Sequence, residues 1–219
     1  MDLISAMEQR HSVRAYQDRT LEPDVREALQ EAVAAVNRDS GLHIQLVTDE
    51  PKAFDCMMAH YGKFSGVTSY LALIGPKGPD LEERCGYYGE KLVLRAQQLG
   101  LNTCWVAMSY QKVPSAFVLA PGEKLVVVIA LGYGKTSGVA HKSKSPDAVS
   151  SGGGPDWFAA GVRAALLAPT AMNQQKFRFT LEGNRVTAKA GVGFYTRLDL
   201  GIVKYHFELG AGTEHFTWA

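Results

Sequence analysis

The sequence predicts an α+β fold, in which helices cover both faces of a mixed or antiparallel sheet. Helical and strand-like segments alternate without the regular period of a parallel βαβ array. Residues 124–134, KLVVVIALGYG, form the most strand-like run, and a run this apolar is typical of a central strand covered on both faces. The composition is that of an ordinary globular protein, because 46% of the 219 residues are hydrophobic and 21% are charged.

Hydrophobic periodicity and turn residues place the elements of the first part of the chain. Apolar residues that recur every three or four positions indicate helices, and short β-branched runs indicate buried strands. In chain order we expect a helix at 3–10, a helix from 23 to about 36 that stops at 37–41, a strand at 43–48, a helix at 51–61, a strand at 67–75, a helix at 80–99, a strand within 100–107 and the central strand at 124–134.

A polar connection rich in Gly and Ser separates this part from a shorter second part. After the connection at 135–155 we expect a helix at 156–167, a hairpin at 176–190 that turns at 182–185, and a helix at 199–209. We therefore divide the chain into residues 1–149 and 150–219, packed as one compact unit. Both parts run from helix to strands, which leaves an internal structural duplication open.

Charge and apolar run lengths exclude several classes of protein. Lys and Arg number 23 against 22 Asp and Glu, so the net charge of +1 offers no long-range attraction to nucleic acid. The longest wholly apolar run, 125–131, is far shorter than a membrane span, and the N-terminus lacks a signal-like apolar stretch, so we expect a cytoplasmic protein. Cys56, Cys85 and Cys104 lack close pairing, which argues against a disulfide framework and a structural zinc site.

The segment RHSVRAY follows the first expected helix and brings Arg10, His11, Ser12 and Arg14 together. Arginine forks beside a hydroxyl suit a phosphate group, because hydrogen bonds from arginine are charge-assisted and often bidentate. A solvated surface cluster is the alternative. The segment is therefore a candidate phosphate site.

A second basic stretch lies between Glu123 and Asp147, where the sequence has no acid. Its basic residues are Lys124, Lys135, His141, Lys142 and Lys144. An exposed loop with solvated lysines is one interpretation, and a second arm over the same phosphate is the other.

The segment APTAMNQQ, residues 168–175, follows an expected helix that Pro169 interrupts. It offers Thr170, Asn173, Gln174 and Gln175, and amides suit a flat heteroaromatic edge that carries both donors and acceptors. Capping and loop hydrogen bonds are the alternative use of these side chains.

Together these segments resemble the FMN-dependent nitroreductase family. RHSVRAY is similar to the family's N-terminal flavin-phosphate motif and LGLNTCWVA to its helix-to-strand flavin segment. VVIALGYG is similar to its late core strand, and APTAMNQQ followed by FRF to the motif that contacts the isoalloxazine ring. The resemblance implies a three-layer α/β/α fold with a mixed, mainly antiparallel central sheet, and a bound FMN.

The resemblance also assigns roles to matching positions. It implies FMN-phosphate and ribityl contacts for Arg10, His11, Ser12 and Arg14, phosphate contacts for Lys142 and Lys144, a place beside the flavin for Trp105, Val106 and Ala107, and a place facing the ring system for Pro169, Thr170, Asn173 and Gln175. No catalytic side chain and no metal are expected, because the hydride chemistry belongs to the cofactor. A packed core residue is the alternative for Trp105, and Cys104 is expected to be a buried thiol.

The order of the motifs departs from the family's usual one. The family's alanine-proline-serine motif comes just after the second helix, whereas here NRDSG holds that place and the motif appears at 168–175. This order resembles a subgroup of short nitroreductase-like proteins in which one chain supplies both halves of the site. We therefore expect an intrachain FMN site in a pseudo-dimeric monomer, with a homodimer left open. Lys176 and Phe177 replace the usual proline and tryptophan, which bears on substrate contacts more than on FMN.

The function implied by the resemblance is that of an oxidoreductase with small-molecule substrates. NAD(P)H would deliver electrons through flavin N5 to nitroaromatic, quinone or similar electron-poor acceptors. Because the sequence lacks a GxGxxG motif, the nicotinamide would bind transiently on the flavin. Two alternatives stay open: an FMN-binding or storage module with little turnover, and an FMN-free scaffold whose basic cluster binds another phosphate ligand.

Overall fold

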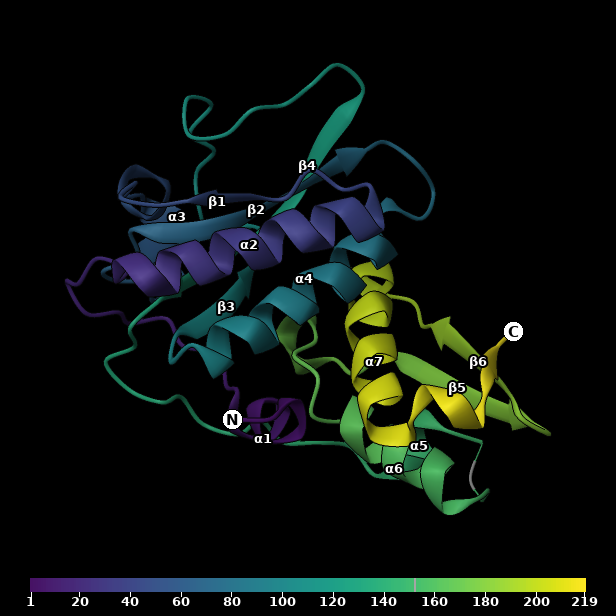
Figure 1. Ribbon diagram of the computed structural model, residues 1–219. Coiled ribbons are helices and arrows are strands. Elements are labelled where there is room, and N and C mark those ends of the chain that lie inside the picture. The colour runs from purple at the N-terminus through teal and green to yellow at the C-terminus, as the bar shows by residue number, and fades with distance from the viewer. Residues whose placement is uncertain (152) are drawn as a thin grey trace. The chain divides into compact units, whose positions relative to one another are not determined.

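The structure, a computed structural model, describes residues 1–151 and 153–219 and has the expected α+β class (Figure 1). The chain forms two compact units. The first, which we call the sheet unit, contains Gln9–Leu81 and Leu92–Val139, and the second, which we call the hairpin unit, contains Met1–Glu8, Glu82–Lys91 and Ala140–Ala219. Each unit is thus assembled from separate chain segments, and the division into residues 1–149 and 150–219 stays a prediction.

The sheet unit is built on four antiparallel strands. The strands are β1 (Gln45–Val47), β2 (Ser69–Pro76), β3 (Asn102–Val106) and β4 (Glu123–Gly132), in the order β1-β2-β4-β3. The apolar run at 124–134 was expected to be the central strand, and this is confirmed because β4 pairs with β2 on one side and β3 on the other. The pairs between these four strands are all antiparallel, and a parallel bridge joins Ser12 to Thr103 of β3, so the sheet is mainly antiparallel, as expected.

The two faces of this sheet are covered differently. Tyr70, Ala72 and Ile74 alternate along β2 and join a buried cluster with Phe54 and Phe64, which come from the connections rather than from long helices. The intervening Leu71 and Leu73 are completely buried on the opposite face. Figure 1 shows helix α2 (Pro23–Ser40) running across the sheet, and α2 contacts β1.

Two helices near this sheet differ from expectation. Helix α2 continues four residues beyond the expected end, to Ser40, where Gly41 adopts a left-handed φ of 65° and its N–H donates to the Asn37 carbonyl. The expected helix at 51–61 is two short elements, the 3-10 helix η1 (Lys52–Phe54) and α3 (Met57–Tyr61). The break occurs because Phe54 is drawn inward, where its ring lies 5.2 Å from that of Phe64.

The hairpin unit combines helices with a small sheet. Its elements are α5 (Pro146–Val149), α6 (Asp156–Ala165), the 3-10 helix η2 (Ala171–Asn173), β5 (Phe177–Glu182), β6 (Arg185–Ala190), α7 (Thr196–Ala211), the 3-10 helix η3 (Thr213–His215) and β7 (Thr217–Trp218). The expected hairpin is confirmed, because Glu182 pairs with Arg185 across the turn. The parallel strand β7 beside β6 was not expected from the sequence, and α5 lies within the predicted connection.

The N-terminal part of α4 (Leu81–Gln98) and helix α7 touch backbone to backbone within the hairpin unit. A Cβ added at Gly201 would lie 1.9 Å from the Glu83 carbonyl oxygen, and one at Gly86 would lie 2.0 Å from the Leu198 carbonyl oxygen. Only glycine fits at such a crossing. The N-terminal helix α1 spans Leu3–Gln9.

A buried pair links the same two helices farther along. The His206 Nε2 lies 2.9 Å from the Glu90 carboxylate, and the His206 Nδ1 lies 3.2 Å from the Ala164 carbonyl oxygen. Both side chains have no exposed surface. Since a carbonyl oxygen accepts only, Nδ1 carries a proton that it donates to Ala164.

Within residues 1–151 and 153–219, no helix is long and apolar enough to cross a membrane.

Candidate functional site

The segment RHSVRAY is held in the sheet unit by its backbone. Ser12 forms a parallel bridge with Thr103 of β3, Ala15 bridges Ser65, and Tyr16 bridges Gly134. The Val13 N–H also donates to the Thr103 carbonyl at 3.0 Å. The segment therefore lies along the outer edge of β3, and its position does not depend on the polar side chains that it carries.

The side chains of this segment differ in exposure. Arg10 is 3% exposed, His11 and Ser12 are half-buried, and Arg14 is exposed with its guanidinium carbon 5.9 Å from the centre of the Phe64 ring. A glycine loop closes over the segment: Gly138 has a φ of 74°, and a Cβ there would lie 2.8 Å from that of His11. Close backbone approach at this point requires glycine.

The thiol of Cys104 lies next to these charges. Burial raises the pKa of the Cys104 thiol, while the guanidinium groups of Arg14 and Arg10 and a hydrogen bond with Ser12 act in the opposite direction. The expected buried thiol is confirmed, since Cys104 is 3% exposed. A thiol with a raised pKa stays protonated at neutral pH and is a poor nucleophile.

A cavity in the sheet unit joins two of the predicted motifs. Its volume is about 290 Å³. It is lined by Arg14, Tyr61, Gly62, Lys63, Phe64, Trp105, Val106, Ala107 and Ser109. Arg14 of RHSVRAY thus shares a cavity with Trp105, Val106 and Ala107, which come from the end of β3 and the residue after it.

Sequence reasoning missed Tyr61, Lys63 and Phe64. Tyr61 was expected to end a helix, and Lys63 and Phe64 follow it. Only the fold brings this segment to Arg14, whose carbonyl accepts the Ser65 N–H at 3.0 Å. Lys63 has a left-handed φ of 62°, which is uncommon for a non-glycine residue and is often found at functional sites. The lining of the cavity contains two cationic side chains and no carboxylate, so it favours an anionic or electron-rich ligand.

In the hairpin unit, the amides of APTAMNQQ bind other parts of the chain. Gln175 is 3% exposed, and its Nε2 donates to the Lys142 carbonyl at 2.9 Å and to the Asn173 Oδ1 at 2.7 Å. Its Oε1 accepts the Lys144 N–H at 2.8 Å. Gln175 thus makes the loop hydrogen bonds that Sequence analysis gave as the alternative use of these amides. Its contact with the flavin ring stays a prediction.

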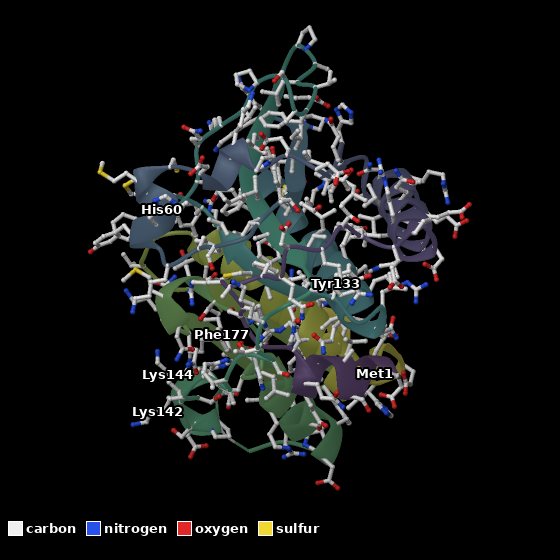
Figure 2. The ribbon with its side chains drawn as sticks, turned by 90° about the vertical axis from the view of Figure 1, so that its left-hand side faces the viewer. Met1, His60, Tyr133, Lys142, Lys144 and Phe177 are labelled. Carbon is white, nitrogen blue, oxygen red and sulfur yellow. The ribbon has the colours of Figure 1, made fainter. Side chains whose placement is uncertain are left out.

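Lys142 and Lys144 are brought to this segment by the same network, and Figure 2 shows both on one side of the hairpin unit. The Lys144 Nζ donates to the carbonyls of Gln174 and Gln175 at 2.8 and 3.0 Å, so this ammonium already has two acceptors. Asn173 Nδ2 donates to the Lys142 carbonyl at 2.8 Å. The structure therefore joins Lys142, Lys144, Asn173 and Gln175 within one unit.

The same segment has an unusual backbone. Met172, Asn173 and Gln175 have left-handed φ values of 52°, 52° and 45°. Each such residue costs on the order of 1–3 kcal/mol and persists only where its surroundings hold it. Pro169 and Thr170 precede the strained residues and are half-buried.

Asp199 of α7 helps to stabilise this strained segment. Its carboxylate accepts the Ala171 N–H at 2.9 Å and the Gln174 Nε2 at 2.8 Å, and Asp199 is 1% exposed. Burial raises the pKa of Asp199 to about 6, although both hydrogen bonds act to lower it. Asp199 was not singled out from the sequence, because its role depends on a turn 25 residues or more away along the chain.

Lys176 and Phe177, which replace the usual proline and tryptophan, differ in exposure. Phe177 is 5% exposed and its ring packs edge-on against that of Phe179, with the centroids 5.6 Å apart. Lys176 is exposed. The buried Phe177 fills the core of the hairpin unit, so Lys176 alone of the two is available to a ligand.

Comparison with known proteins places the fold. A protein from Thermotoga maritima described as a putative nitroreductase superimposes with a TM-score of 0.69 at 22% identity, over 96% of this chain and 83% of that one. A putative nitroreductase from Desulfovibrio desulfuricans, solved in complex with FMN, gives 0.54 at 15% identity, over 68% of this chain and 95% of that one. A putative NADH dehydrogenase/NAD(P)H nitroreductase from Parabacteroides distasonis gives 0.51 at 22% identity, over 66% and 96%.

These likenesses confirm the expected nitroreductase-type fold, and the predicted internal duplication stays a prediction. No curated protein matches the chain. Residues 2–211 match the family described as "Putative TM nitroreductase", and the chain therefore belongs to that nitroreductase family.

Proposed function

We propose that the protein binds FMN and acts as an oxidoreductase that passes electrons from NAD(P)H, through flavin N5, to nitroaromatic, quinone or similar electron-poor acceptors. The observation that carries the proposal is the cavity of the sheet unit, in which Arg14 of RHSVRAY meets Trp105–Ala107. The FMN bound to the structural relative from Desulfovibrio desulfuricans, together with family membership, supports the choice of cofactor.

The residues of the sheet unit fit this cofactor chemically. FMN combines an anionic phosphate with a flat aromatic ring, and the cavity combines Arg14 and Lys63 with the aromatic side chains of Phe64 and Trp105. Strand β3 ends at Val106, so Ala107 lies beyond the ladder with β4 and its backbone polar groups are not used by that pairing. Charge, ring faces and backbone groups are the features that a flavin site requires.

We propose the following set of FMN-binding residues. They are Arg10, His11, Ser12 and Arg14 for the phosphate and ribityl chain, Lys142 and Lys144 for the phosphate, Trp105, Val106, Ala107 and Lys63 beside the flavin, and Pro169, Thr170, Asn173 and Gln175 for the ring system. All of them are on one chain, so we further propose that a monomer suffices to bind FMN.

When bound, FMN would supply the hydride chemistry. The protein would supply position and charge. The cations Arg14 and Lys63 favour negative charge in the cavity, and the rings of Phe64 and Trp105 cover apolar surface and exclude water. The protonated Cys104 takes no part as a nucleophile. The protons that the reduced acceptor takes up would come from solvent, so we assign no side chain as an acid or base.

The test is the visible spectrum of the purified protein, taken with and without added FMN and then after anaerobic addition of NADH or NADPH. We expect a yellow protein whose flavin bands bleach with the donor and return when a nitroaromatic or quinone is added. Size-exclusion chromatography of the yellow protein then reports whether the FMN-bound species is a monomer.

Each other outcome points to a different function. A yellow protein that neither donor bleaches would favour the FMN-binding or storage module. A protein that takes up no FMN would contradict the proposal and favour a scaffold for another phosphate ligand.

A further inference from the structure

Three large apolar side chains of the hairpin unit project into solvent beside the APTAMNQQ segment. Met172, Val192 and Phe194 are 93%, 93% and 79% exposed. Met172 lies in the segment itself, and the other two lie in the turn between β6 and α7. Single exposed apolar residues are common, but here they occur on two connections that are bonded to each other.

Backbone groups of the turn at 191–194 form hydrogen bonds with the APTAMNQQ segment and with Lys176, which follows it. The Gly191 N–H donates to the Lys176 carbonyl at 2.8 Å, and the Gln174 Nε2 donates to the Phe194 carbonyl at 2.7 Å. A Cβ at Gly193 would lie 2.5 Å from the Gln174 Oε1, so the two connections touch. Phe194 is therefore an exposed ring on a backbone that is already fixed, which lowers the entropy cost of binding to it.

Lys176 places a positive charge next to the turn that carries this ring. Its Nζ lies 3.2 Å from the position that a Cβ on Gly193 would occupy, so the ammonium adjoins the residue before Phe194. Two exposed cations, Arg178 and Lys189, pair across the hairpin at the end that leads into this turn. Asp199 is 1% exposed and its carboxylate accepts two hydrogen bonds from the segment. The local charge therefore favours an anion.

We propose that Lys176 and Phe194 form a recognition site for flat aromatic acceptors that carry an acidic group, with the acid group on Lys176 and the ring against Phe194. The inference rests on the proposed function, and it names the class of acceptor that this protein prefers. Charge complementarity and the fixed, exposed ring are the observations that carry it. The replacement of the family's usual proline by Lys176 then changes substrate choice and leaves FMN in place.

The test uses two acceptors that differ only in charge. 4-Nitrobenzoate and 4-nitrobenzamide share the ring, the nitro group and nearly the same size, and only the first is an anion. We expect the FMN-loaded protein to favour the benzoate in kcat/KM. Lys176→Gln should lower kcat/KM for the benzoate by about tenfold, the loss of one charge-assisted contact, and leave the benzamide unchanged.

Two further variants complete the design. Phe194→Ala should lower kcat/KM for both acceptors, because it removes the ring and not the charge. Arg185→Gln, an exposed cation at the other end of β6 beside Glu182, is the matched control and should change neither. Equal effects of Lys176→Gln on both acceptors, or no effect on either, would overturn the proposal.

A binding measurement separates this proposal from the proposed function. Calorimetric titration of each acceptor into the protein with excess FMN and no electron donor reports recognition without turnover. Weaker benzoate binding by Lys176→Gln supports the recognition site even if NAD(P)H fails to reduce the flavin. Unchanged binding contradicts it even if turnover is efficient. FMN uptake, read from the absorbance of the same samples, tests the proposed function independently.

Discussion

The sheet unit and the hairpin unit each carry motifs of the proposed flavin site, but they position them in opposite ways. In the sheet unit the backbone of RHSVRAY is bridged to Thr103, Ser65 and Gly134, so the side chain of Arg14 is left to line a cavity. In the hairpin unit the side chains of Gln175 and Asp199 make the hydrogen bonds that hold the APTAMNQQ segment in place.

The difference teaches that a polar residue in a ligand motif has two uses that sequence alone does not separate. Where backbone bridges fix a segment, as in RHSVRAY, an exposed side chain such as that of Arg14 is available to a ligand. Where the backbone is irregular, as at Met172–Gln175, side chains must satisfy the buried polar groups instead. Substitution of Arg14 should therefore affect binding more than stability, and substitution of Gln175 should do the reverse.

The largest expected effect comes from the glycine crossing that holds the hairpin unit. Gly201→Ala should destabilise the protein by more than about 3 kcal/mol, because the new Cβ meets the Glu83 carbonyl at 1.9 Å and the helices must separate. Gly78→Ala is the control, since a Cβ there meets only the Asp80 carboxylate, at 3.1 Å. Urea denaturation measures both. A cost below 1 kcal/mol for Gly201→Ala would mean that α4 and α7 are not in backbone contact.

The second effect is a pH dependence that belongs to Asp199. The folded-state pKa of about 6 lies above the ordinary value of 3.8, so the folded protein binds more protons between these values, and stability is lost as pH rises through 6. A difference of about two pKa units corresponds to about 3 kcal/mol. The stability of the parent relative to Asp199→Asn should fall by this amount from pH 3 to pH 8.

Denaturation of the parent, Asp199→Asn and the exposed control Asp147→Asn across this pH range measures the difference. Parallel curves for the parent and Asp199→Asn would show that Asp199 does not titrate in that range in the folded protein.

The third effect tests the hairpin-unit side of the comparison directly. Gln175→Ala should cost about 1–3 kcal/mol of stability, because it leaves the Lys144 N–H without its 2.8 Å acceptor and removes the link to Lys142. The neighbouring Lys176→Ala, at an exposed position, is the control and should change stability by less than about 0.5 kcal/mol. Thermal unfolding compares the two. Equal small losses would place Gln175 with the free ligand-binding side chains.

The fourth effect tests the sheet-unit side. Arg14→Ala should weaken FMN binding by about 1.5–3 kcal/mol through loss of a charge-assisted contact, while the stability of the FMN-free protein stays within about 0.5 kcal/mol. Fluorescence titration gives the FMN affinity, and Arg19→Ala, an exposed arginine outside the cavity, is the matched control. Unchanged affinity for FMN would remove Arg14 from the site.

Local pattern predicted much of the fold. The apolar run at β4, the turn between β5 and β6 and the long helix α4 each follow from signals within a short window, and each is confirmed. The break between Phe54 and Met57 could not be predicted in this way, because it follows from the packing of Phe54 against Phe64. The strand β7 is two residues long and pairs only through contacts made by the fold.

The candidate site was predictable to the extent that its residues lie in recognisable segments. Arg14 and Trp105–Ala107 were found by motif, and the structure brings them to one cavity. Lys63 was missed because it belongs to no motif and reaches that cavity through a left-handed turn. The buried state of Gln175 was also beyond the sequence, which shows an amide but not whether its partner is a ligand or the chain itself.

The buried imidazole of His206 provides a probe of local opening in the hairpin unit. Its Nδ1 proton is donated to the Ala164 carbonyl and no part of the ring meets water, so deuterium replaces this proton only while α7 has moved away. In NMR spectra recorded after transfer to D2O, the resonance should fade more slowly the smaller the fraction of time that the unit is open. Addition of any ligand that stabilises the unit, FMN included, would slow that fading, which reports binding without any flavin signal.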